Sequence, residues 1–207
     1  MSTHFYETRL GHGLPHDPFK AIVAPRPIGW ISTVDAEGRV NLAPYSFYNA
    51  FNSNPPIVGF ASEGRKDSLQ NIEATGEFVC NLATRPLAEV MNRCSAPLPH
   101  GVSEMEHAGI EAAPSSLVRP PRVANTPAAL ECRLLQIVPL RDLEGQEVDT
   151  HLVLGQVVGV HIDRAYLVDG IFDLRAARPI GRCGYRGDYA EMGEMFEMFR
   201  PRGPRPR

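Results

Sequence analysis

Short runs of β-branched and aromatic residues, separated by turn signals, predict strands along most of the chain. Ile28–Val34 and Val40–Ala43 flank the turn signal Asp35–Gly38, which predicts a hairpin. Pro44 is expected to stop the ladder pairing after the second of these strands, because proline has no backbone N–H to donate. Further strands are predicted over 46–51, 57–61 and 77–82.

Two segments change to a helical period. Asp67 and Ser68 precede an apolar face and Gly76, which predicts a short helix with these two residues as its N-cap and the glycine at its C-terminus. A second helix is predicted to open at Pro86. Residues 95–127 are rich in proline and small residues and predict a long excursion with at most one short helix, whose capping box is Ser103 to Glu106.

Two long strands, 128–140 and 151–163, predict a second hairpin. In the later strand the even positions from Leu152 to Ile162 are mostly apolar and are expected to face the core. The odd positions include Gly155 and Gly159, so the opposite face is expected to be open at the glycines. Six or seven closely spaced strands with short helical insertions predict a mainly β fold, a small antiparallel barrel.

Size and composition limit the function. A chain of 207 residues can bury about 70% of its surface, which fits one domain over 1–199, followed by an Arg/Pro-rich flexible tail over 200–207. The net charge of −3 argues against a nucleic-acid partner, and no apolar run reaches the ~20 residues of a membrane span. With no apolar signal segment at the start, the expected location is cytoplasmic. The four cysteines lack the spacing of a metal site or a disulfide framework.

The run from Ser62 to Asn71 is the strongest local indication of a ligand. A strand is followed by a glycine, two cations and a helix start, and such a start offers free N–H groups and a positive dipole end to a phosphate. The alternative is a capped helix whose charged first turn is simply solvated. Neither a Walker loop nor a dinucleotide fingerprint is present.

The stretch from Asn41 to Asn52 interleaves polar and aromatic residues around Pro44. It can offer hydrogen bonds and a flat apolar wall to a heteroaromatic ring, or it can be an edge strand with ordinary core aromatics. No serine elbow and no paired carboxylates indicate a hydrolase.

Taken together, these segments resemble the flavin reductase-like, FMN-binding split-barrel family, with the flavoredoxin-like branch as the nearest match. The resemblance runs from about residue 18 to 201, and five motifs in the same order carry it. They are Arg26–Thr33, Gly38–Ser46, Ser62–Asn71, Thr150–Val157 and Pro179–Tyr189. Within the last of them, Cys183–Gly187 departs from the Leu-Gly-Gly type of run expected there.

The resemblance implies a Greek-key split barrel, a homodimer, and FMN bound in a groove near the subunit interface. It places the phosphate on Ser62, Arg65, Lys66, Asp67 and Ser68. It places the isoalloxazine against Ser46 and Asn49 with Phe47 and Tyr48 between them, and the ribityl or ring side against Trp30, Ser32 and Thr33.

Two functions follow from this resemblance. The first is a reductase that passes electrons from NADH or NADPH to free flavin or to another small-molecule or protein acceptor, with the chemistry supplied by the flavin itself. The second is a carrier whose FMN exchanges electrons with a protein or metal partner. A split-barrel oxidase or haem-using relative is a third possibility, which the phosphate run disfavours.

His151 is the one catalytic candidate. It begins a predicted strand, and Gly155 on the same face is expected to leave room for a ring. An imidazole there can donate a hydrogen bond to a flavin carbonyl or to the nicotinamide amide. The alternative is a strand-end histidine bonded to a neighbouring loop.

Overall fold

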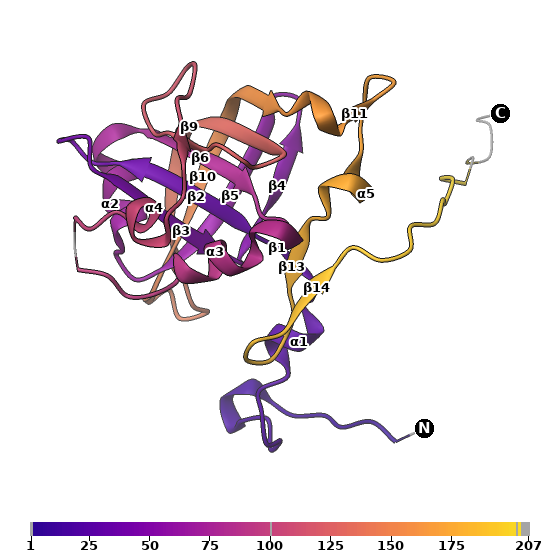
Figure 1. Ribbon diagram of the computed structural model, residues 1–207. Coiled ribbons are helices and arrows are strands. Elements are labelled where there is room, and N and C mark those ends of the chain that lie inside the picture. Colours follow the sequence, from indigo (N-terminus) through magenta and orange to yellow (C-terminus); the bar gives the residue numbers. More distant parts are fainter. Residues whose placement is uncertain (1, 100, 202, 204–207) are drawn as a thin grey trace.

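One curved antiparallel sheet forms the body of the molecule in the computed structural model, which describes residues 2–99, 101–201 and 203 (Figure 1). Strands make up 40% of the chain and helices 18%, which confirms the mainly β fold. In spatial order the strands of the sheet are β3 (Val40–Tyr45), β2 (Gly29–Val34), β6 (Glu77–Leu82), β9 (Ala128–Arg141), β10 (Glu147–Ile162), β5 (Pro56–Glu63) and β4 (Tyr48–Ser53).

The sheet curls until its two edge regions meet. The Tyr45 ring on the edge strand β3 lies 4.6 Å from the Phe60 ring on β5, centroid to centroid. The connection from β3 to β4 crosses between these edges, and the Phe47 carbonyl accepts a hydrogen bond from the Ala61 N–H at 2.8 Å. The chain is therefore closed into a barrel at this point.

Short helices, 3-10 turns and short strands lie around the barrel. The helices are α1 (Phe19–Ile22), α2 (Asp67–Thr75), α3 (Ala88–Arg93), α4 (Glu104–Ala108), α5 (Leu174–Ala177) and the 3-10 turns η1 (Thr8–Leu10), η2 (Arg85–Leu87) and η3 (Arg164–Tyr166). The short strands are β1 (Arg26–Pro27), β7 (Ala112–Ala113), β8 (Arg122–Val123), β11 (Leu167–Val168), β12 (Ile171–Phe172), β13 (Ile180–Arg182) and β14 (Tyr189–Glu191). None of the helices in the described residues is both long and apolar enough to span a membrane.

Both expected hairpins and both expected helices are present, with differences at their ends. Gly76 ends α2 in the left-handed region at a φ of 71°, as its position predicted. The N-cap of α2 is Lys66, so Asp67 and Ser68 fall inside the first turn. Ser103 is the N-cap of α4, but its side chain caps no N–H, so the predicted capping box does not form.

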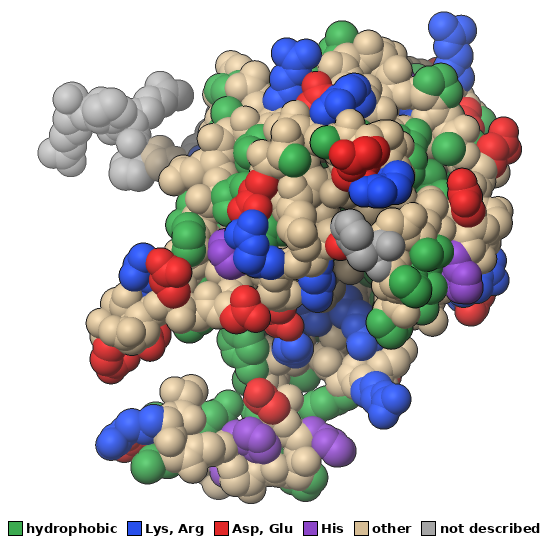
Figure 2. Space-filling model, turned by 90° about the vertical axis from the view of Figure 1, so that its left-hand side faces the viewer, with side chains coloured by type: hydrophobic (Ala, Val, Ile, Leu, Met, Phe, Trp, Pro, Cys, Tyr) green, Lys and Arg blue, Asp and Glu red, His purple; other side chains and the backbone are tan. Residues whose placement is uncertain are grey.

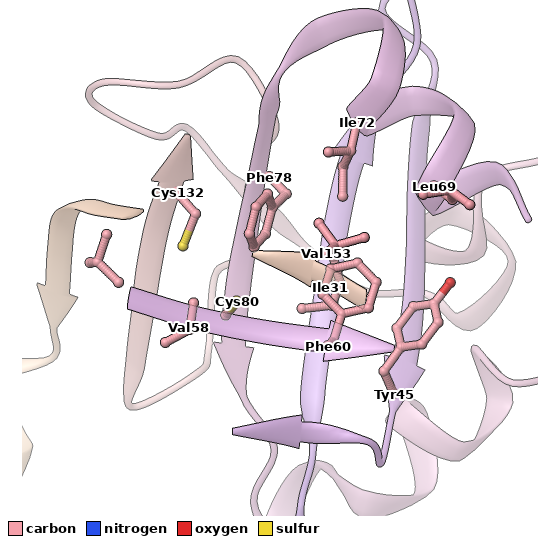
Figure 3. Close-up of a cluster of buried hydrophobic side chains, with 11 residues drawn as sticks. Ile31, Tyr45, Val58, Phe60, Leu69, Ile72, Phe78, Cys80, Cys132 and Val153 are labelled. Atoms are coloured by element: carbon pink, nitrogen blue, oxygen red, sulfur yellow. The ribbon is translucent and has the colours of Figure 1, made fainter. Parts of the chain in front are cut away.

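The main hydrophobic core lies between the concave face of the sheet and α2. Leu69 and Ile72 of α2 are fully buried, and Figure 3 shows Ile72 pointing from the helix toward Phe78, Val153 and Ile31 of the sheet. The cluster comprises Ile31, Tyr45, Val58, Phe60, Leu69, Ile72, Phe78, Cys80, Cys132, Val153 and Val157. Its packing fixes α2 on the barrel.

The core face of β10 is the opposite of the predicted one. Val153 on the odd face is fully buried, whereas Val160 and Ile162 on the even face are 58% and 40% exposed. The odd face is not open at Gly155 either, because the Phe78 ring of β6 occupies the space where a side chain would stand. A register shift between Val157 and Gly159 also breaks the simple alternation along the strand.

Pro44 does not end its strand, contrary to the prediction. It pairs with Trp30 across the β2–β3 ladder, and β3 continues to Tyr45. Because β3 is the edge of the sheet, the missing N–H of Pro44 leaves no strand partner unsatisfied.

The chain between β6 and β9, residues 83–127, includes the predicted excursion over 95–127. It packs on the outer face of β6 and β9, and a buried carboxylate anchors it. Glu131 on β9 accepts hydrogen bonds from the N–H groups of Ser116, Leu117 and Val118 at 2.6, 2.6 and 3.1 Å. Burial acts to raise the pKa of Glu131, but these donors and His161 outweigh it and hold the pKa below its usual value. The ionised carboxylate therefore fixes the loop on the sheet.

The packing at Gly155 gives a first prediction. A Gly155→Ala change places a methyl group into the Phe78 ring, and such overpacking costs about 1–3 kcal/mol. Urea unfolding should show that loss. Gly193→Ala is the matched control, because nothing lies within 4 Å of a Cβ there and its stability should stay within about 0.5 kcal/mol of the wild type. Equal stability of the two variants would contradict the packing.

Candidate functional site

A cavity of about 610 Å³ opens where β3, the start of α2 and the chain after α3 meet. This volume lies in the usual range for small-molecule sites, about 300–1,000 Å³. We call it the main cavity, and it is lined by Lys20, Asn41, Ala43, Pro44, Tyr45, Ser46, Phe47, Ala61, Glu63, Lys66, Asp67, Ser68, Cys94, Ser95, Ala96, Pro97, Leu98 and Glu104.

Buried hydrogen bonds between side chains position the start of α2 at this cavity. The Asn41 Nδ2 on β3 donates to the Thr33 Oγ1 on β2 at 3.2 Å and to the Ser68 Oγ on α2 at 2.8 Å. The Asn71 Nδ2, one turn further along α2, donates to the same Thr33 oxygen at 3.0 Å. These bonds tie the helix to both strands, so its first turn has a fixed place at the cavity wall.

The start of α2 gives this wall the character of an anion site. The N-cap residue of α2, Lys66, does not cap the helix with its side chain, and the nine residues of α2 align their dipoles with the positive end at Lys66. The Lys66 ammonium and the Ser68 side chain line the same wall. A backbone N-terminus, a cation and a hydroxyl are the groups that recognise phosphate.

Another part of the lining is aromatic and carries a buried polar group. Pro44, Tyr45 and Phe47 contribute to it. The Tyr45 hydroxyl is buried beside the Ser68 and Ser62 hydroxyls, but it makes no hydrogen bond of good geometry among the described residues. Burial raises the pKa of Tyr45, so the hydroxyl stays protonated and can donate to a ligand. The Lys20 ammonium lies 5.6 Å from the centroid of the Phe47 ring.

Burial shifts the pKa of two further groups that line the main cavity, Glu104 and Cys94. Burial raises the pKa of Glu104, although the Leu42 N–H donates to its carboxylate at 2.9 Å and opposes that shift. Burial also raises the pKa of Cys94 to about 11, so this thiol is not a nucleophile at neutral pH.

Five of the predicted site residues are brought together in the main cavity. Ser46 and Phe47 come from the connection after β3, and Lys66, Asp67 and Ser68 from the start of α2. These are the residues whose motifs the sequence placed at a strand end and a helix start.

The other predicted residues do not line the main cavity. Trp30, Ser32, Thr33 and Ser62 are completely buried, and Ser62 donates its hydroxyl to the Gly64 carbonyl at 3.1 Å. Tyr48 packs against the core, and Asn49 is exposed on β4, where its Oδ1 accepts from the Ala50 N–H at 2.8 Å. The Arg65 guanidinium turns to α2 and pairs with Glu73, Nη1 to Oε1 at 3.0 Å.

His151 also lies outside the lining of the main cavity. It stands opposite Ser62 in the β5–β10 ladder, half-buried, and its Nδ1 is buried without a hydrogen-bond partner in the described chain. The room expected for a ligand ring at Gly155 is filled by Phe78, so that part of the reasoning is wrong.

Sequence reasoning missed the contributions of distant segments. Lys20, the stretch 94–98 and Glu104 all line the cavity. Sequence reasoning had assigned Lys20 to an irregular lead-in, Cys94 to the helix that opens at Pro86, and 95–98 and Glu104 to the long excursion. The only sequence signal near Glu104 was the capping-box pattern Ser103 to Glu106, which predicted a short helix there. Asn41 and Tyr45, by contrast, belonged to the polar and aromatic stretch that had been singled out.

Comparison with known proteins gives one family. The model of the flavin reductase like domain matches residues 23–173. A protein of Deinococcus radiodurans is 38% identical over 210 residues, covering 96% of this chain and 89% of its own.

Solved structures agree with that family in fold. Nitrilotriacetate monooxygenase component B from Bacillus cereus has a TM-score of 0.84 at 28% identity, covering 95% of this chain and 100% of its own. Flavoredoxin of Desulfovibrio vulgaris (Miyazaki F) has a TM-score of 0.74 at 19% identity, covering 84% and 90%. The expected split-barrel fold is confirmed.

The raised pKa of Cys94 gives a second prediction. Iodoacetamide reacts with thiolates, so Cys94 should stay unmodified at pH 8 and become reactive only as the pH rises toward about 11. Peptide mapping by mass spectrometry measures this, and the half-buried Cys183 serves as the internal comparison that reacts first. Modification of Cys94 at pH 8 as fast as that of Cys183 would contradict the burial of this thiol.

Proposed function

The chain belongs to the flavin reductase-like family, and from that premise we propose that it binds FMN and takes electrons from NADH or NADPH to reduce free flavin or another acceptor. Membership already makes it a flavin-related oxidoreductase. The observation that supports this specific proposal is the main cavity, whose lining combines the start of α2 at Lys66 with the aromatic residues Tyr45 and Phe47.

The residues of the main cavity fit FMN at both of its ends. A phosphate suits the first turn of α2 with Lys66 and Ser68. A polar heteroaromatic ring suits the wall of Tyr45 and Phe47, because the orphan Tyr45 hydroxyl would gain an acceptor there. The fit therefore rests on an unsatisfied group of this structure as well as on shape.

Each part of the site has a distinct task in this proposal. When bound, FMN supplies hydride and single-electron transfer, and the protein positions it. Lys66 and Ser68 hold the phosphate. Tyr45 donates a hydrogen bond to the flavin ring and keeps its proton, because burial raises its pKa. The stretch 94–98 and Glu104 cover the remaining side of the cavity and limit the access of water to it.

Not all predicted contacts have equal support. For Arg65 to reach a phosphate, its guanidinium must leave Glu73. The contribution of β2 to the site is indirect. Its buried residues Trp30, Ser32 and Thr33 hold the neighbouring strand β3 in place, and Thr33 accepts the hydrogen bond from Asn41. Direct flavin contacts by Trp30, Ser32, Thr33, Tyr48, Asn49, Ser62 and Asp67 stay predictions of the family resemblance.

We also propose a homodimer of single-domain subunits, located in the cytoplasm. The support for the dimer is the outer face of β10, where Val160 and Ile162 are 58% and 40% exposed with no cover from the described chain. The domain spans 1–199. Of the proposed flexible tail over 200–207, residues 202 and 204–207 lie outside the described residues.

FMN affinity tests the phosphate site. Replacing Arg65 and Lys66 together by Ala should weaken FMN binding at least ~10-fold, since a charge-assisted hydrogen bond contributes about 1.5–3 kcal/mol. Because Lys66 lines the cavity and Arg65 pairs with Glu73, Lys66→Ala alone should cause most of the loss. Flavin fluorescence titration measures it, with Arg164→Ala as a control that leaves affinity unchanged. Unaltered affinity in the double variant would refute the site.

Anaerobic stopped-flow mixing tests the reaction. The FMN-loaded protein should bleach rapidly with NADH or NADPH, whereas bleaching only by a reduced protein partner would make it a carrier instead. In the same assay, a catalytic His151 predicts that His151→Ala keeps FMN affinity and lowers the reduction rate ~10-fold, about 1.4 kcal/mol of transition-state stabilisation. An unchanged rate with lower thermal stability would make His151 structural.

A further inference from the structure

A second cavity, of about 580 Å³, adjoins the main cavity and takes no part in the proposed FMN site. It lies between the segment 15–20 and the turn 184–186 that connects β13 to β14, and Lys20 lines both cavities. Figure 2 shows a hollow on this face, between the body of the molecule and the lobe beneath it, with Lys and Arg side chains gathered at its depth and His side chains on the lobe.

We propose that this second cavity binds the phosphate-bearing adenosine end of the nicotinamide dinucleotide and that, through the 2′-phosphate, it makes NADPH the preferred electron donor. The inference rests on the proposed reductase function and deepens it. It concerns residues outside the FMN site apart from Lys20.

The two walls of the second cavity are held together by a buried guanidinium. Arg26 is 7% exposed and donates to the carbonyls of Lys20 and Val23 on one side and of Cys183 on the other, the last at 3.0 Å. Gly184 packs so closely on Ala21 that a Cβ at Gly184 would overlap that residue. The cavity is therefore preformed, which lowers the cost of ordering a ligand in it.

The lining of the second cavity matches an adenosine phosphate. Lys20, Arg186 and His16 can donate to phosphate oxygens, and the Arg186 guanidinium forms no ion pair within the described part of the chain. Tyr185 is 47% exposed, and its ring lies 5.9 Å from that of His16, centroid to centroid, so two flat faces are available to a base. The one acid, Asp17, is engaged with the Phe19 N–H at 2.9 Å.

The two cavities are arranged for one ligand to span them. Lys20 stands between them, with its ammonium 5.6 Å from the centroid of Phe47, which lines the main cavity. A dinucleotide anchored at Arg186 can extend past Lys20 and bring its nicotinamide end to the aromatic wall. Tyr185 and Arg186 both lie in the turn between β13 and β14, on the same side of the second cavity as Gly184.

Arg186 can distinguish NADPH from NADH by the 2′-phosphate that only NADPH carries. NADPH carries a dianionic phosphate on the adenosine ribose where NADH has a hydroxyl, so a cation there favours NADPH. Losing one charge-assisted contact of this kind lowers affinity by ~10-fold or more.

Isothermal calorimetry on the full-length FMN-loaded protein tests the subsite without turnover. Adenosine 2′,5′-bisphosphate should bind at least ~10-fold more tightly than AMP, and Arg186→Gln should remove that advantage while FMN stays bound. The matched control is Arg164→Gln on η3, which lies next to β11 and far from α1 in Figure 1, and it should bind the bisphosphate like the wild type. Equal binding of both nucleotides by the wild type, or an unaffected Arg186→Gln variant, would overturn the proposal.

Two further arms separate this proposal from its rivals. In stopped flow, Arg186→Gln should raise the NADPH concentration for half-maximal flavin reduction ~10-fold, with the limiting rate and the NADH response unchanged. A wild type reduced equally well by both nucleotides overturns the subsite and leaves the reductase intact, whereas no reduction by either refutes the reductase itself. If FAD binds more tightly than FMN and Arg186→Gln abolishes the difference, the cavity serves the flavin and the proposal fails.

Discussion

The first turn of α2 is held on the barrel by a few buried hydrogen bonds between side chains, and the main cavity depends on them. Asn41 and Asn71 both donate to the Thr33 hydroxyl, and Asn41 also reaches Ser68. Unpaired polar groups at this depth would be costly, so the bonds allow one placement of the helix. Leu69 and Ile72 fix its other side in the core, and Lys66 is thereby held at the cavity that Tyr45 and Phe47 also line.

The fold was predictable wherever its signals were local. The turn at Asp35–Gly38 and the helix that ends at Gly76 needed no tertiary information. The core face of β10 was mistaken because both of its faces carry apolar residues and the face with fewer of them is the buried one. There Gly155 leaves space that Phe78 fills from another strand, and Pro44 is tolerated because β3 is an edge strand. Both facts depend on neighbours that a single sequence does not reveal.

The residues of the candidate site likewise fall into those with a local sequence signal and those without one. Lys66, Ser68 and Phe47 were found because a strand end and a helix start place them together within a short stretch. Lys20 and Glu104 were missed because only the folded chain brings their segments to the cavity. Arg65 shows the converse, since a cation in the right motif turns away to Glu73 on its own helix.

The excursion between β6 and β9 has a consequence for how such a protein can change over generations. β6 and β9 are direct antiparallel neighbours, so the chain leaves the sheet after Leu82 and returns at Ala128 beside the place it left. Residues 94–98 and Glu104 of this excursion line the main cavity but belong to no strand of the barrel. Insertions, deletions and substitutions in the excursion can therefore remodel what the cavity accepts while the strand register stays the same, so ligand preference and foldability are free to drift separately.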